Sequence, residues 1–138
     1  MSYCSEAYLR KMAKSEDWRD RQRIAENLYT PVDTLIQLSE DPNYWVREAV
    51  ASNPRTPAEV LTKLAEDKRY SVRWKVAGNF NTPADALAKL SEDKVWYVRW
   101  GVAENPNTPV EVLTKLSEDE VYDVRKHAEK KFERRTNK

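Results

Sequence analysis

The sequence predicts an all-α fold, an α-solenoid of five stacked two-helix repeats of 26 residues each. Two observations lead to this prediction. Threonine-proline recurs every 26 residues, and each pair opens a similar phrase: TPVDTLIQLSED, TPAEVLTKLAED, TPADALAKLSED and TPVEVLTKLSED. A second phrase follows in register: WVREAVASNP, SVRWKVAGNF, YVRWGVAENP and DVRKHAEKKF. A fixed period of this length is typical of a chain that stacks one supersecondary unit repeatedly.

The first helix of each repeat is predicted to begin at the Thr-Pro pair. In the second full copy, Thr56 fits the N-cap with Pro57 at the first helical position, and Glu59 completes a T-x-x-E capping box. Leu61 and Leu64 are three residues apart and form the buried stripe. We therefore expect a helix of about ten residues here.

The second helix is predicted to begin near Asp67 as N-cap and to bury Val72, Val76 and Ala77. Asn79 is predicted to end it in the left-handed conformation that asparagine tolerates. Proline follows the equivalent asparagine in two other copies and prevents the helix from continuing. Two short helices joined by a tight turn form an αα-hairpin that cannot bury its apolar stripe alone, which favours stacking.

We expect one repeat domain over residues 1–138. The full copies occupy residues 30–55, 56–81, 82–107 and 108–132, and a degenerate first copy occupies residues 4–29, where Cys4-Ser5 replaces Thr-Pro. The last copy lacks the Asn-Pro stop and continues as a basic C-terminal cap over residues 125–138, which holds seven Lys/Arg against two Glu. This composition is more typical of a solvated helix end than of a binding arm.

Composition argues against several functions. The formal net charge of +1 gives no general attraction to nucleic acid or membrane. Cys4 is the only cysteine, so an intramolecular disulfide and a cysteine-based metal or iron–sulfur site are excluded. The N-terminus shows no apolar signal segment and no run approaches membrane-spanning length, so we expect a cytoplasmic protein that does not contact a membrane. No metal-binding or cofactor-binding residues are expected.

An acidic and a basic residue recur in every full copy as D-x4-V-R. The pairs are Asp41/Arg47, Asp67/Arg73, Asp93/Arg99 and Asp119/Arg125. This unit resembles HEAT repeats, and with the NPxTP turns at residues 53–57 and 105–109 it resembles the leucine-rich repeat variant family still more. The resemblance implies a right-handed superhelix in which one helix of each pair can be short or 3₁₀. In HEAT-like stacks these residues form a ladder, and their recurrence favours the same structural role here.

The repeats differ on one side of the second helix. At 100° per residue, the positions of Trp45, Glu48, Ala49 and Ser52 fall on its outer side. Glycine in a helix costs about 1 kcal/mol relative to alanine, so a glycine on this side needs a reason. The residues that we predict to bind a partner all lie here, and they are Trp45, Trp74, Lys75, Gly78, Tyr97, Trp100 and Gly101.

Two interpretations of these residues stay open at this point. Either the glycines open a slot with aromatic walls, or neighbouring helices pack closely there and the tryptophans fill the gap. Exposed aromatic surface often marks an interaction site, which favours the slot. A second aromatic column is present in all five copies and is predicted to close the seam between repeats: Trp18, Tyr44, Tyr70, Trp96 and Tyr122.

The predicted function is a non-catalytic binding scaffold that presents this aromatic groove to a protein or peptide. The alternative is a nucleic-acid-binding protein, although residues 30–119 carry eleven Lys/Arg against fourteen Asp/Glu. The chain has one histidine and no phosphate-binding glycine loop, so we do not expect an enzyme. The one enzymatic alternative is a glycosylase with HEAT-like repeats. The sequence leaves the oligomeric state and the identity of the partner open.

Overall fold

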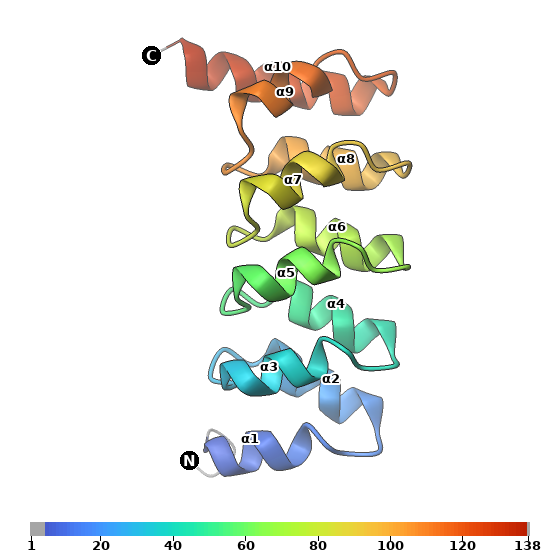
Figure 1. Cartoon of the computed structure of the whole chain (residues 1–138), viewed down its shortest axis with the longest axis vertical. Coiled ribbons are helices and arrows are strands. Elements are labelled where there is room, and N and C mark those ends of the chain that lie inside the picture. The colour runs from blue at the N-terminus through green and yellow to red at the C-terminus, as the bar shows by residue number, and fades with distance from the viewer. Residues whose placement is uncertain (1–4, 138) are drawn as a thin grey trace.

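The computed structural model describes residues 5–137, and every regular element in that range is a helix. The five repeats consist of α1 (Glu6–Met12) and α2 (Trp18–Glu26), α3 (Val32–Leu38) and α4 (Tyr44–Ser52), α5 (Ala58–Leu64) and α6 (Tyr70–Gly78), α7 (Ala84–Leu90) and α8 (Trp96–Glu104), and α9 (Val110–Leu116) and α10 (Tyr122–Thr136). They stack in chain order along one axis, with the two termini at opposite ends (Figure 1). The prediction of an all-α solenoid of two-helix repeats is confirmed. Cys4 and Lys138, the outer limits of the predicted first repeat and basic cap, lie outside the described residues.

The first helix of each repeat is α-helical and seven residues long, shorter than predicted. The predicted capping box does not form. Pro57 takes the N-cap position of α5, with no side-chain hydrogen bond to the helix. The hydroxyl of buried Thr56 instead donates to the carbonyl of Val50 at 2.6 Å, which satisfies the end of the preceding helix.

The second helices begin two residues later than predicted, because Asp67 is not the N-cap. Arg69 takes that position in α6, and the Asp67 carboxylate accepts the backbone N–H of Arg69 at 2.9 Å. The same carboxylate also receives the guanidinium of Arg47 from the preceding repeat. Asp67 therefore shapes the turn and joins two repeats.

The asparagine that ends each second helix is not left-handed. Asn79 has φ −82° and ψ 132°, an extended conformation. Its side-chain Nδ2 donates to the carbonyls of Ala51 at 2.8 Å and Asn53 at 3.0 Å, both in the preceding repeat. Its Oδ1 accepts the N–H of Asn81 at 2.8 Å. Because Asn53 and Asn105 bond in the same way, the asparagines form a ladder of buried amides between repeats.

The core runs as a continuous strip between the two layers of helices. One leucine of each first helix and the valines of α4, α6, α8 and α10 are fully buried. The second helices pack directly on the second helices of neighbouring repeats. They therefore form a closely packed layer whose outer side is the face on which the repeats differ.

The predicted Asp–Arg residues link successive repeats. Each arginine pairs with the aspartate of the following repeat at 2.7 Å, through both carboxylate oxygens: Arg21–Asp41, Arg47–Asp67, Arg73–Asp93 and Arg99–Asp119. Arg125, in the last repeat, donates to the carbonyl of Asp119 and lies over the ring of Tyr122. Burial alone would raise the pKa of the Asp119 carboxyl, but the hydrogen bonds from Arg99 and the Val121 N–H outweigh it and hold that pKa below its usual value.

A residue of the basic C-terminal segment also bonds to the preceding repeat. Arg135, near the end of α10, donates from its guanidinium to the carbonyls of Asn105, Pro106 and Thr108. These carbonyls correspond to the ones that Asn79 and Asn81 satisfy two repeats earlier. Arg135 therefore makes the bonds to the preceding repeat that the asparagines make elsewhere in the stack.

Candidate functional site

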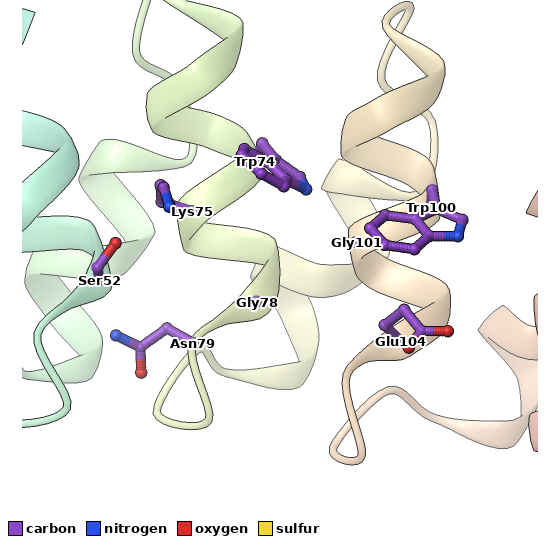
Figure 2. A pocket seen from close by; sticks show the side chains of 8 residues that line it. All are labelled: Ser52, Trp74, Lys75, Gly78, Asn79, Trp100, Gly101 and Glu104. Atoms are coloured by element: carbon purple, nitrogen blue, oxygen red, sulfur yellow. The ribbon is translucent and has the colours of Figure 1, made fainter.

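The largest group of predicted binding residues lines one cavity on the second-helix face. The cavity has a volume of about 340 Å³ and lies mainly between α6 and α8, with Ser52 contributed by α4. Figure 2 shows its lining residues, with Trp74 and Trp100 projecting from adjacent helices. The lining residues are Ser52, Trp74, Lys75, Gly78, Asn79, Trp100, Gly101 and Glu104. Five of the seven predicted partner-binding residues are among them.

The two glycines of this cavity have different structural roles. A Cβ atom at Gly101 would lie 3.0 Å from Ala77 Cβ and 3.2 Å from Trp74 Cδ1, so glycine is needed where α8 approaches α6. A Cβ atom at Gly78 would meet nothing within 4 Å. The close-packing interpretation therefore applies to Gly101 and the open-slot interpretation to Gly78.

Alanine substitutions at the two glycines should have opposite effects on stability. We expect Gly101→Ala to lower the free energy of unfolding by about 1–2 kcal/mol, because overpacking outweighs the better helix propensity. Gly78→Ala should raise it by up to about 1 kcal/mol, since its methyl group enters open space. Urea unfolding followed by circular dichroism measures both changes. The same sign for both variants would contradict the assigned roles.

Charged groups lie at both sides of the cavity. Lys75 Nζ lies 4.9 Å from the ring centroid of Trp74, a cation–π contact within the chain. On the opposite side, Glu104 Oε2 lies 3.3 Å from His127 Nε2 in the following repeat. This oxygen is buried and has no hydrogen-bond partner among the residues that the structure describes. The ring of Trp100 meets that of His127 edge to face, with centroids 5.4 Å apart.

The contact between Glu104 and His127 depends on a proton. His127 Nδ1 lies 3.0 Å from the carbonyl of Asp123, and a carbonyl oxygen can only accept, so Nδ1 must donate. In a neutral imidazole whose proton is on Nδ1, Nε2 carries no proton and cannot donate to the Glu104 carboxylate. Both contacts are therefore satisfied together only when the imidazole carries two protons.

Trp45 and Tyr97 do not line this cavity. Trp45 stacks on Trp18 of the preceding repeat at 5.0 Å between centroids, and Tyr97 stacks on Trp96 at 4.2 Å. Both remain nearly half exposed and line smaller hollows on either side, between α2 and α4 and between α8 and α10. The hollows follow one another along the second-helix face, and we call this series the groove.

Only part of the second aromatic column closes the junctions between repeats. Trp18, Tyr44 and Trp96 pack against the core, as predicted. Tyr70 is 44% exposed and Tyr122 is 61% exposed, so these two do not close the junction between repeats. The rings of Tyr44 and Tyr122 are covered by arginine guanidinium groups, from Arg69 and Arg125, which shows that side chains other than the column itself contribute to the junction.

Sequence reasoning missed Glu104 as a site residue. It lies one turn after Trp100, on the same face of α8, and it occupies the column of Gly78 and Ser52. That register is the signal that could have found it. Within residues 5–137, no three His, Cys, Asp or Glu side chains form a group able to hold a metal ion. None of the described helices combines the length and apolar character needed to cross a bilayer.

Comparison with known proteins agrees with the repeat pattern. The family model of the leucine-rich repeat variant matches residues 44–68 and 96–121. A solved structure, described as a leucine-rich repeat variant with a novel repetitive structural motif, is similar at 27% identity with a TM-score of 0.75. The match covers 92% of this chain and 51% of that chain, so the present chain spans about half the length of that structure. No curated protein matches the sequence.

Proposed function

We propose that this helical repeat protein of the leucine-rich repeat variant family is a non-catalytic scaffold that binds a protein or peptide in the groove of its second helices. Repeat proteins bind partners on extended surfaces formed by the variable positions of successive repeats. Here those positions include Trp74 and Trp100, and tryptophan is among the residues most enriched in binding hot spots.

The observation that carries the proposal is the cavity beside Gly78. Its mouth is open because this position has no side chain, and nothing in the fold requires glycine there. Gly78 has no positive φ and lies at the end of α6, where the other repeats carry larger residues. Glycine lowers helix stability, and at position 78 it leaves space between two tryptophans. Its presence is explained if a bound partner fills that space.

The charge of the groove favours a protein partner over nucleic acid. Four arginines are committed to aspartates within the stack, and the hollows include the acidic side chains of Glu48 and Glu104. A polyanion needs a surface that neutralises several phosphates. A groove with mixed charges and aromatic walls suits a peptide better.

Trp100→Ala tests the scaffold proposal. Trp100 is half-buried and packs against the core, so circular dichroism first establishes that the variant is folded. Peptides selected from a randomised display library on the wild-type chain should bind this variant about 30-fold more weakly, since a hot-spot tryptophan contributes about 2 kcal/mol or more. Titration calorimetry measures the affinity. Trp74→Ala is less informative because Trp74 also packs on Gly101.

Tyr29→Ala is the matched control. Tyr29 is an aromatic residue that is 66% exposed and lies outside the groove, in the turn before α3. Its loss should leave peptide affinity within about twofold of wild type. Equal binding by folded Trp100→Ala and wild type would remove the proposed binding site.

A further inference from the structure

We propose that the cavity between α6 and α8 binds an arginine side chain of the partner peptide. Trp100 would stack on the guanidinium, and the Glu104 carboxylate would accept its N–H groups. This inference rests on the proposed scaffold function and adds the chemistry of the bound side chain. It follows from three observations about the two residues and their neighbours.

The first observation is the state of the Glu104 carboxylate. Oε2 is buried without a hydrogen bond, and its neighbour His127 supplies a charge partner only when protonated. Burying a carboxylate oxygen without a hydrogen-bond donor costs free energy. A ligand that donates to this oxygen removes that cost, which adds to its binding free energy. The side chain as a whole keeps 36% of its surface exposed and lines the cavity, so a ligand there reaches the carboxylate group, and its buried Oε2 becomes available when the group rotates away from His127.

The second observation is the position of Trp100. It lies one helical turn before Glu104 on the same face of α8, and Figure 2 shows both side chains beside the cavity. Among residues 5–137, the cation–π contacts place Lys75 over Trp74 and no lysine or arginine over Trp100. An indole and a carboxylate one turn apart can therefore contact the same bound cation from two sides.

The third observation concerns the opposite charge on the cavity wall. Lys75 is the other charged lining residue, and on its own it would attract an acidic ligand. Its ammonium already contacts the Trp74 ring at 4.9 Å, whereas the buried oxygen of Glu104 has no donor. The Glu104 carboxylate therefore needs a positively charged hydrogen-bond donor, and the cavity itself does not supply one.

Arginine meets this requirement better than lysine. Its guanidinium is planar, stacks on aromatic rings and offers paired donors that match a carboxylate, while an ammonium is a strongly hydrated point charge. Because a guanidinium loses less hydration on entering a cavity with aromatic walls, the Trp100 side of the cavity favours arginine.

The test uses short peptides that are identical except for one central residue: arginine, its neutral isostere citrulline, norleucine or glutamate. Binding to the full chain is followed through the indole N–H signals of the tryptophans in nitrogen-15 NMR spectra. We expect the arginine peptide to shift the Trp100 signal and to bind about tenfold more tightly than the citrulline peptide. Equal binding by citrulline or norleucine, tighter binding by glutamate, or no binding by any peptide would overturn the inference.

Two variants separate the carboxylate from the fold. Glu104→Gln should lower affinity for the arginine peptide about tenfold and remove its advantage over citrulline. Glu66→Gln is the control, because Glu66 is an exposed glutamate in the turn between α5 and α6 that lines none of the hollows of the groove. It should leave affinity unchanged. Unaltered discrimination by Glu104→Gln would contradict the inference.

Failure of the arginine-site inference can be distinguished from failure of the scaffold proposal. Library peptides that depend on Trp100 but lack arginine and ignore Glu104→Gln would leave the scaffold standing and refute the cation site. Library peptides that ignore Trp100→Ala would refute the scaffold itself.

Discussion

Replacing Asn79 by leucine should lower the free energy of unfolding by about 3–5 kcal/mol. The change keeps the number and branching of the side-chain heavy atoms but removes three hydrogen bonds at a position that is only 7% exposed. The carbonyls of Ala51 and Asn53 lie at the end of α4, where the helix offers them no donor. The buried carbonyl of Ala51 would be left unsatisfied, which is the costly part of the substitution, whereas the carbonyl of Asn53 would keep its bond from the N–H of Thr56. Urea unfolding followed by circular dichroism measures the loss.

The neighbouring Asn81 provides the control for this prediction. Its Nδ2 also donates to carbonyls of the preceding repeat, those of Pro54 and Thr56, but the side chain is exposed. Water can replace its bonds, so Asn81→Ala should cost about 1 kcal/mol. Equal losses for the two variants would mean that burial of the amide is not what makes the Asn79 ladder stabilising.

The period of the sequence was sufficient to predict the solenoid, because each copy repeats both the apolar stripe and the turn. The roles of Thr56, Asp67 and Asn79 were predicted wrongly for a common physical reason. Rules for helix ends assign a polar side chain to the helix that it adjoins. In this stack the Thr56 hydroxyl bonds six residues back, and the Asn79 amide bonds 26 and 28 residues back. Such partners exist only after the repeats have stacked.

The candidate site was predictable in position but not in detail. A helical wheel places Gly78 and Gly101 on the same side, yet only the approach of Trp74 and Ala77 distinguishes their roles. Glu104 resembles any acidic residue at the end of an exposed helix. Its significance comes from the proximity of His127, 23 residues later in the chain. The structural role of a residue at a given repeat position therefore depends on its side-chain contacts with neighbouring repeats.

Arg73→Met should cost about 3–5 kcal/mol, because it leaves the Asp93 carboxylate without its partner. The two side chains are 12% and 9% exposed, so water compensates the lost charge poorly. The variant also removes a donor from the carbonyl of Asp67, at 2.7 Å. The exposed pair Lys115–Glu92 connects adjacent repeats at 3.0 Å and is the control, since Lys115→Met should cost about 0.5 kcal/mol or less.

The double variant Arg73→Met/Asp93→Asn shows which part of this cost is electrostatic. Asparagine at position 93 removes the unpaired charge and keeps an acceptor for the N–H of Val95, which bonds Asp93 at 2.9 Å. We expect the double variant to recover about 2 kcal/mol of the loss in a urea titration. If it recovers nothing, the cost of Arg73→Met arises from the unsatisfied carbonyl of Asp67, and the arginine acts as a helix-end donor more than as an ion-pair partner. A full recovery would instead mean that the ladder fixes how neighbouring repeats align without adding net stability.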